Sequence, residues 1–145
     1  MTMLVKDIMN KDVEKATVDM TVSEAAAMMS EKNVEYLIVV KDARLAGIVT
    51  EDDIIKKVVG KDRQPKETTV GDIMVSKVVH IGPENSLEDA AEVMTENKIE
   101  KLPVVVDHKL LGIVTASDVV AAEPKMMEQL GELVILARKQ KSVAG

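Results

Sequence analysis

The chain has no cysteine, no tryptophan and no phenylalanine, and Tyr36 is its only tyrosine. Without cysteine there are no disulfides, no thiolate catalysis and no zinc sites built on thiolates. With so few aromatic side chains there is no platform on which nucleic-acid bases would stack. The ten methionines and the many aliphatic residues must fill the core instead.

Positive charge is also in short supply, because 25 acidic residues outnumber 19 basic ones and leave a net charge of −6 over 145 residues. Such a balance disfavours binding to a phosphate backbone. No apolar run approaches the length of a membrane span, and residues 1–7 carry charges where a signal peptide needs an apolar core. We therefore expect a cytoplasmic protein with neither a nucleic-acid nor a membrane partner.

What the chain does contain is a duplication. Residues 5–55 and 70–120 align without a gap at an offset of 65 and agree at roughly 20 of about 51 positions. A unit this short rarely buries a sufficient core alone, so the two copies are expected to pack across a pseudo-twofold axis. Whatever cleft one copy lines, the other should line again, and a pair of related sites is expected.

Each repeat predicts an opening strand, a helix, a hairpin and a second helix. The first helices begin at Thr21 and Ser86, each followed three residues later by an acidic side chain, as in a capping box. The second helix of repeat 1 begins at Thr50 and is expected to stop at Gly60, a residue suited to a left-handed helix end. Its counterpart begins at Thr115 and extends toward the next proline.

The hairpins are predicted from apolar runs. Runs without alternation at 37–40 and 102–106 indicate strands buried on both faces. Short polar turns then lead into second strands at 45–49 and 110–114.

The remaining segments set the expected boundaries: repeat 1 at 5–64, the end of a linker at 65–69, repeat 2 at 70–124, and a C-terminal helix and tail at 125–145. The last segment has a wide apolar helical face, with Arg138, Lys139 and Lys141 at its far end, where a helix dipole favours cations. We expect this helix to cover the core or form a dimer seam, since a membrane-surface helix usually carries aromatic anchors.

The strongest local motif is Gly-hydrophobic-hydrophobic-Thr-x-x-Asp, at 47–53 and again at 112–118. Free amides at a helix start offer a position for an anion, and the carboxylates of Asp53 and Asp118 suit the paired hydroxyls of a ribose. The glycine leaves room for close packing or for a ligand. Thr-x-x-Asp is equally a variant of the capping box, so a cap and a ligand site both stay open.

The order of these pieces resembles the tandem CBS (cystathionine-β-synthase-type) domain over about residues 5–122. The matching pieces are Asp7-Ile8-Met9, Asp72-Ile73-Met74, Leu102-Pro103-Val104-Val105 with Asp107, and the two closing Gly-Ile-Val-Thr-x-x-Asp motifs. The resemblance implies an α/β (α+β) fold of two β-α-β-β-α repeats with pseudo-twofold symmetry, here with an added C-terminal helix. It also implies a regulatory module that forms a homodimer and acts on an unknown protein.

The resemblance further implies an adenosine-containing ligand (AMP, ADP, ATP or S-adenosylmethionine) in clefts between the repeats. We expect no cofactor and no metal. Carried over, the ligand-binding residues are Thr17, Val18, Tyr36, Leu37, Ile38, Thr50 and Asp53 in the first cleft, and Gly82, Pro83, Lys101, Leu102, Pro103, Thr115 and Asp118 in the second. Glu35 and Glu100 stand where many members carry a basic residue, which favours nucleosides or S-adenosylmethionine over polyphosphates. Because Glu51 and Asp52 add negative charge to the first motif only, phosphate-bearing ligands are expected to prefer the second cleft.

A catalytic function is not expected. His80 and His108 occupy non-equivalent positions in the repeats, and neither a nucleophile elbow nor a Gly-x-x-x-x-Gly-Lys loop is present. The alternative to ligand sensing is a structural or dimerisation adaptor that keeps the fold but no longer binds nucleotide.

Overall fold

A computed structural model describes residues 2–144, with side chains placed through Ala137. The chain divides into two compact units. The repeat-1 unit comprises Val13–Val78 with His108–Leu110, and the repeat-2 unit comprises residues 2–12, 79–107 and 111–144. The segment that opens each repeat in sequence therefore belongs to the unit built by the other repeat.

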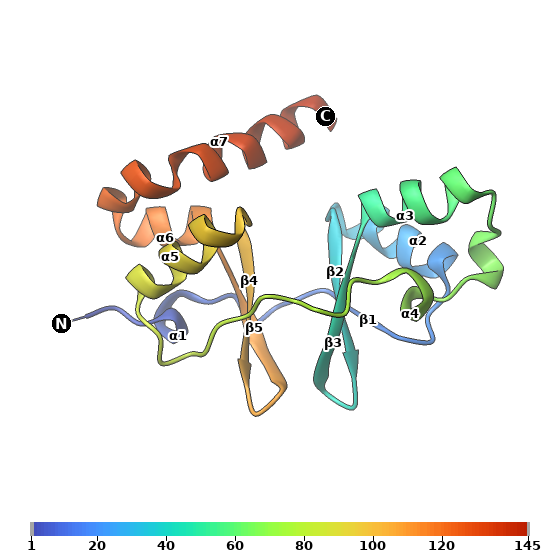
Figure 1. Cartoon of the computed structure of the whole chain (residues 1–145), viewed down its shortest axis with the longest axis horizontal. Helices are drawn as coiled ribbons and strands as arrows, with labels where there is room; N and C mark the ends of the chain where they lie inside the picture. The colour runs from blue at the N-terminus through green and yellow to red at the C-terminus, as the bar shows by residue number, and fades with distance from the viewer. Residues whose placement is uncertain (1, 145) are drawn as a thin grey trace. The chain divides into compact units, whose positions relative to one another are not determined.

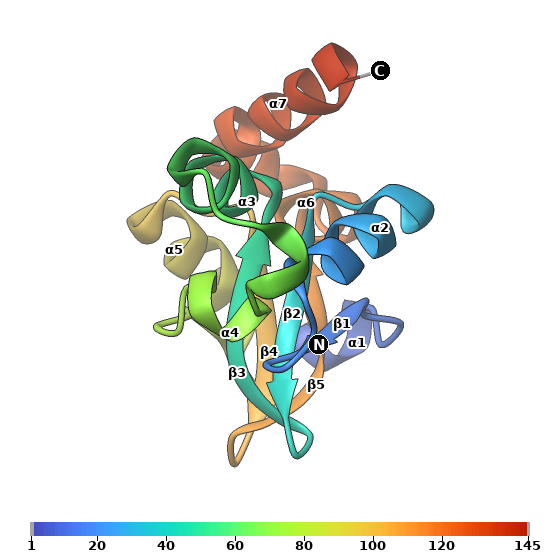
Figure 2. The same cartoon turned by 90° about the vertical axis from the view of Figure 1, so that its right-hand side faces the viewer.

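The repeat-1 unit contains three strands, three helices and two short 3₁₀ turns (Figure 1). In chain order these are β1 (Lys15–Thr17), α2 (Val22–Lys32), β2 (Tyr36–Lys41), β3 (Arg44–Thr50), α3 (Glu51–Lys57), η1 (Val59–Lys61), η2 (Pro65–Glu67) and α4 (Val70–Ile73). Strand β2 pairs in parallel with β1 on one side and antiparallel with β3 on the other. Figure 2 turns this unit toward the viewer, with its helices in front of the hairpin.

The repeat-2 unit has its helix, hairpin and helix in the same order, but a one-turn helix precedes them instead of following them, and one additional helix ends the chain of elements. Its elements are α1 (Val5–Ile8), α5 (Leu87–Asn97), β4 (Lys101–Val106), β5 (Lys109–Thr115), α6 (Ala116–Ala122), η3 (Pro124–Met126) and α7 (Met127–Ala144). The first two residues of β5 are grouped with the repeat-1 unit, where Lys109 pairs with Arg44 of β3. The predicted α/β fold of two tandem repeats with a C-terminal helix is confirmed.

The predicted helix starts are found where the capping residues place them. The Ser86 hydroxyl accepts a bond of 3.0 Å from the Asp89 amide, and the Asp89 carboxylate accepts one of 3.0 Å from the Ser86 amide. In α2 the Thr21 hydroxyl accepts a bond of 3.1 Å from the Glu24 amide, but the Glu24 carboxylate accepts from the Thr21 hydroxyl instead of its amide. The capping box is thus complete in α5 and half formed in α2.

Both hairpins close through two-residue turns in the left-handed region. Asp42 and Ala43 have φ of 53° and 66°, and Asp107 and His108 have φ of 50° and 69°. Two consecutive left-handed residues give the turn whose twist matches that of the flanking strands. The short polar loops predicted from sequence therefore have the backbone that a tight hairpin requires.

The predicted opening strand is present in repeat 1 and absent, within the described residues, from repeat 2. Where repeat 1 has β1, repeat 2 has a single bridge between Ile81 and Val104. The reason lies in the partner strand, where Ile38 donates its amide to the Glu14 carbonyl at 3.1 Å. The residue equivalent to Ile38 is Pro103, which has no amide hydrogen to donate.

The predicted end of the second helix at Gly60 was wrong. Helix α3 ends at Lys57, and Gly60 lies inside the 3₁₀ turn η1. The left-handed residue that closes the segment is Asp62, with φ of 54°, and its amide donates to the Val59 carbonyl at 3.2 Å. Aspartate tolerates this conformation better than most residues with a Cβ atom, so a glycine was not needed.

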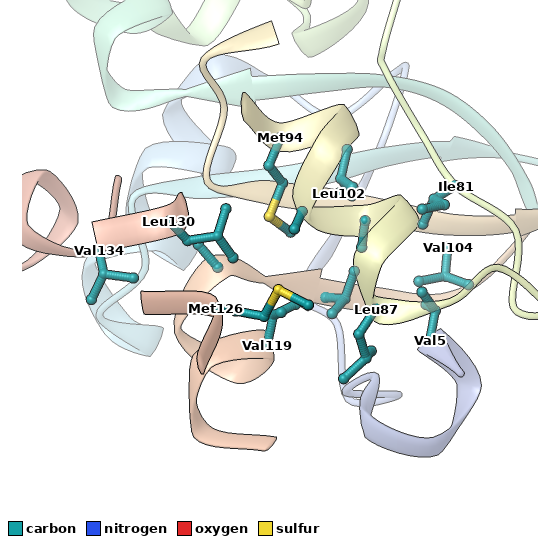
Figure 3. Packing of buried hydrophobic residues seen from close by; sticks show 14 residues of the cluster. Val5, Ile81, Leu87, Met94, Leu102, Val104, Val119, Met126, Leu130 and Val134 are labelled. Atoms are coloured by element: carbon teal, nitrogen blue, oxygen red, sulfur yellow. The ribbon is translucent and has the colours of Figure 1, made fainter. Parts of the chain in front are cut away.

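Each unit has its own hydrophobic core. In the repeat-2 unit, Leu87 and Met94 of α5, Leu102 of β4 and Leu130 of α7 are fully buried together (Figure 3). Val134, one helical turn beyond Leu130, is 1% exposed, so α7 covers this core as one of its two expected roles required. The basic side chains expected at the far end of α7 lie outside the described residues. In the repeat-1 unit the core is formed by Ala16, Val22, Ala25, Met29, Leu37, Val39, Val49, Val58, Val70 and Ile73.

Candidate ligand site

The Thr-x-x-Asp motif of repeat 1 joins β3 to α3. Thr50 ends the strand and caps the helix, and its hydroxyl accepts a bond of 3.2 Å from the Asp53 amide. In return, Oδ2 of Asp53 accepts bonds from the Thr50 amide at 3.0 Å and from the Thr50 hydroxyl at 3.1 Å. The motif is a complete capping box, which places the Asp53 carboxylate beside the end of β3.

The motif of repeat 2 builds the same arrangement between β5 and α6. The Thr115 hydroxyl accepts a bond of 3.1 Å from the Asp118 amide, and Oδ2 of Asp118 accepts one of 3.1 Å from the Thr115 amide. The capping interpretation is therefore correct in both repeats. It does not exclude a ligand, because a carboxylate has acceptor sites beyond those that a cap uses.

The two carboxylates differ in what else they contact. Oδ1 of Asp53 lies 3.1 Å from Nζ of Lys57, which also donates a bond of 2.9 Å to the Ile73 carbonyl. Oδ1 of Asp118 has no hydrogen-bond partner among the described residues. Sequence reasoning missed Lys57, although its i,i+4 spacing from Asp53 was the available signal.

The backbone amides at the two helix starts are partly occupied. The Glu51 amide donates to the Glu35 carbonyl at 3.0 Å, and the Ala116 amide donates to the Glu100 carbonyl at 2.8 Å. The amides of Asp53 and Asp118 are bound by the threonine hydroxyls. Fewer backbone amides are therefore free to bind a phosphate than the sequence suggested.

The glycines of the motif serve close packing. A Cβ atom on Gly47 would lie 2.7 Å from the Val75 carbonyl oxygen, and one on Gly112 would lie 2.6 Å from the Asn10 carbonyl oxygen. In both units the residues that follow a one-turn helix pair with the strand next to this glycine. Val75, after α4, pairs with Ile48, and Asn10, after α1, pairs with Ile113. Of the two roles left open for these glycines, packing is the one that the structure supports.

Of the other residues expected in the first cleft, Tyr36 lies nearest the motif. Tyr36 is half-buried and pairs in register with Thr50. Thr17 and Val18 lie further along the sheet, because Thr17 pairs with Val40, four residues beyond Tyr36, or about 13 Å along the strand. The structure brings Tyr36 and the motif together and leaves Thr17 and Val18 at a distance.

Leu37 and Leu102 belong to the two hydrophobic cores and are fully buried. Their side chains are therefore committed to packing, and a ligand would reach these positions through backbone groups. Ile38 and Pro103 are also buried, and the Pro103 carbonyl accepts a bond of 3.0 Å from the Ile81 amide. The apolar runs that predicted buried strands already indicated this burial.

Gly82 and Pro83 form a turn that α1 holds in place. The Lys6 amide donates to the Pro83 carbonyl at 3.0 Å, and the Gly82 amide donates to the Asn85 side-chain oxygen at 3.0 Å. The Lys6 ammonium pairs with Glu84 at 3.0 Å, and this pairing raises the pKa of Lys6. Sequence reasoning missed Asn85, although a side-chain amide in a polar turn commonly binds nearby backbone in this way.

Lys101, expected to bring positive charge to the second cleft, opens β4. Its Nζ atom lies 2.6 Å from a carboxylate oxygen of Glu100, and both side chains are largely buried. The neighbouring carboxylate therefore offsets the lysine charge. Within the part of the chain that the structure describes, no group of three or more His, Cys, Asp or Glu residues is placed to hold a metal ion.

No helix among the described residues is long and apolar enough to cross a membrane.

Comparison with known proteins identifies the repeats. The CBS domain family matches residues 5–60 and 70–125. The mitochondrial CBS domain-containing protein CBSX3 of Arabidopsis thaliana is 40% identical over 111 residues, which cover 73% of this chain and 54% of that protein. The chain thus spans about half the length of this relative.

Two solved structures of CBS domain proteins contain adenosine compounds. The CBS domain pair of protein MJ0100, in complex with 5-methylthioadenosine and S-adenosyl-L-methionine, is 29% identical, with a TM-score of 0.71 over 84% of this chain and 96% of that chain. CBSX2 in complex with AMP is 31% identical, also with a TM-score of 0.71, over 86% of this chain and 98% of that chain. With both repeats matched and the fold shared, the chain belongs to the CBS domain family and carries two tandem copies of the domain.

Proposed function

We propose that this chain is a regulatory module that senses an adenosine-containing ligand. The observation that carries the proposal is the Asp118 carboxylate, which is anchored to Thr115 through Oδ2 and leaves Oδ1 without a partner among the described residues. A carboxylate that is held in place through one oxygen, with the other available as an acceptor, is well suited to the hydroxyls of a ribose. The adenosine compounds bound by MJ0100 and CBSX2 support the choice of ligand class.

Asp53 is the corresponding ribose acceptor of repeat 1 in this proposal, with Tyr36 beside it. The ligand class includes AMP, ADP, ATP and S-adenosylmethionine, and the module transmits occupancy to a regulated protein. Losing a charge-assisted hydrogen bond costs about 1.5–3 kcal/mol, or roughly 10- to 150-fold in affinity. The double variant Asp53→Ala, Asp118→Ala should therefore lose measurable binding.

Calorimetry with AMP, S-adenosylmethionine and GMP tests this proposal on the full chain. Glu96→Ala, which removes an exposed carboxylate from α5, is the matched control and should bind as the parent does. Urea unfolding of each variant separates lost binding from lost structure, since a helix cap alone contributes about 0.5–2 kcal/mol. Unchanged affinity in a folded double variant would refute the assignment.

The competing function is a structural adaptor, which the capping role of both aspartates favours. An adaptor would bind none of the adenosine compounds, and its aspartate variants would change stability alone. The same titration therefore distinguishes the two functions.

We also propose that the chain forms a homodimer through α7. Ile135 and Leu136 are 51% and 54% exposed on this helix, although its opposite face is buried in the repeat-2 core. Sedimentation across a wide concentration range tests this, with Leu136→Glu expected to weaken association. A full chain that stays monomeric at high concentration would exclude it.

A further inference from the structure

The Lys57 side chain contacts the carboxylate of Asp53, which the proposed function assigns to the ribose of a ligand in repeat 1. Its Nζ atom lies 3.1 Å from Oδ1 of Asp53, and Oδ2 of the same carboxylate accepts two bonds from Thr50. Both oxygens of Asp53 are therefore engaged. The Asp53 side chain is only 12% exposed, whereas that of Lys57 is 44% exposed.

Repeat 2 has no lysine at the matching position. At the offset of 65, the counterpart of Lys57 is Ala122. The caps themselves are alike, because the distance from the threonine amide to the aspartate Oδ2 is 3.0 Å in repeat 1 and 3.1 Å in repeat 2. Apart from the bond from the Thr50 hydroxyl to Oδ2 of Asp53, which has no counterpart in the hydrogen bonds of Thr115 and Asp118, the difference between the two carboxylates comes from Lys57, a helical turn away.

We propose that Lys57 is a specificity-determining residue that competes with the ligand for Asp53, so that an adenosine ligand binds at Asp118 first. This inference rests on the proposed function. A ribose hydroxyl that donates to Oδ1 of Asp53 must share this oxygen with the ammonium group or displace it, because Lys57 holds one of its two acceptor positions. At Asp118 the same hydroxyl meets an oxygen that no described residue occupies.

Displacing Lys57 also breaks its bond to the Ile73 carbonyl at the end of α4. Helix α4 in turn holds the turn after β1, because its Val70 and Gly71 amides donate to the Met20 and Val18 carbonyls at 2.8 Å and 3.0 Å. Occupancy of the first position is thereby linked to the packing of α4. Lys57 thus serves both as the competitor and as a tie between two helices of the repeat-1 unit.

The size of the competition follows from the exposure of the pair. Half-exposed ion pairs stabilise modestly, so removing the lysine should tighten binding at Asp53 by about two- to tenfold. Placing a lysine at position 122 should weaken binding at Asp118 by a similar factor. Adenosine is the probe, because it has the ribose without a phosphate that a released lysine would attract.

The experiment reads each position alone in the full chain. Asp118→Asn isolates the first position and is combined with Lys57→Met or Lys57→Gln, the latter keeping a donor for the Ile73 carbonyl. Asp53→Asn isolates the second position and is combined with Ala122→Lys, with Ala122→Met as the control for side-chain size. Calorimetry measures the affinities, and the emission of Tyr36, the only tyrosine, reports on the first position.

The expected result is tighter adenosine binding in both Lys57 variants and weaker binding in Ala122→Lys but not in Ala122→Met. If adenosine binds and neither exchange alters its affinity, the inference is overturned while the proposed function stands. If adenosine, AMP and S-adenosylmethionine all fail to bind the parent chain, the proposed function fails and the inference fails with it.

Discussion

The helix that begins at Thr50 and the helix that begins at Thr115 both start with a threonine–aspartate capping box and end with different side chains. The last two residues of α3 are Lys56 and Lys57, whereas the matching residues of α6 are both alanine. The duplication preserved the cap in both copies. The side chain one helical turn after each aspartate, Lys57 or Ala122, decides which groups of that aspartate are open to a ligand.

The same comparison revises the charge argument for the two clefts. Helix α3 has three acidic residues in its first turn, but Asp52 pairs with Lys56 at 2.9 Å and Asp53 with Lys57 at 3.1 Å. Its net charge is −1, the same as that of α6. The predicted preference of phosphate-bearing ligands for the second cleft therefore rests less on net charge than on the availability of Asp118.

The largest difference between the units is the additional helix in the repeat-2 core, and Leu130→Ala tests it. Leu130 is fully buried, so the substitution should lower the free energy of unfolding by about 2–5 kcal/mol. Leu136→Ala, on the same helix but 54% exposed, should change it by less than about 0.5 kcal/mol. Urea unfolding at low protein concentration measures both, and equal effects would show that α7 does not stabilise the unit by burial.

The motif glycines should behave alike in the two units. Gly47→Ala and Gly112→Ala each push a Cβ atom toward a carbonyl oxygen and should cost about 1–3 kcal/mol of unfolding free energy. Gly131→Ala in α7, where the nearest atom would be 3.8 Å away, should stabilise the helix by about 0.5–1 kcal/mol. If only one motif glycine is sensitive in thermal or urea unfolding, the two strand junctions are not equivalent.

The contributions of the two aspartate caps to stability should differ mainly by the ion pair between Asp53 and Lys57. Asp53→Ala and Asp118→Ala both remove a cap that contributes about 0.5–2 kcal/mol, but Asp53→Ala also removes the bond to Lys57. Its cost should exceed that of Asp118→Ala by roughly 0.5 kcal/mol. In the Lys57→Met background this excess should vanish, and an excess that persists there would show that Lys57 is not its source.

The smallest expected effect is a pH dependence that the two units share. Backbone hydrogen bonds from Thr69 and Ser86 hold the pKa values of Asp72 and Asp89 below their usual 3.8. A pKa lowered in the folded state means that each carboxylate stabilises the fold fully above pH 3.8 and loses this effect as the pH falls through the folded value. Carboxyl NMR titration should give a value below 3.8 for both residues, and Asn variants should lose the corresponding acid sensitivity.

Much of the fold could be predicted from particular residues. Thr21, Ser86, Thr50 and Thr115 mark helix starts because a hydroxyl followed three residues later by a carboxylate satisfies amides locally. The absent strand of repeat 2 was also within reach, since Pro103 removes the amide that Ile38 uses in repeat 1. The end of α3 could not be predicted in this way, because several polar residues after Lys57 tolerate the closing turn.

The sequence predicted the two aspartates of the candidate site, but it did not predict which side chains of the site are free to contact a ligand. Leu37 and Leu102 were assigned to the ligand by position in the family, although their apolar runs indicated core packing. The spacing of Asp53 and Lys57 indicated an ion pair, but spacing alone does not say that the pair forms beside Thr50 and reaches the Ile73 carbonyl. That depends on tertiary packing between α3 and α4.

The most direct test of the unequal positions is a calorimetric titration of adenosine into the full chain, Asp118→Asn and Asp53→Asn. The account predicts two unequal binding steps, of which Asp118→Asn loses the tighter and Asp53→Asn retains it. Two equal steps, or loss of the tighter step in Asp53→Asn, would contradict it.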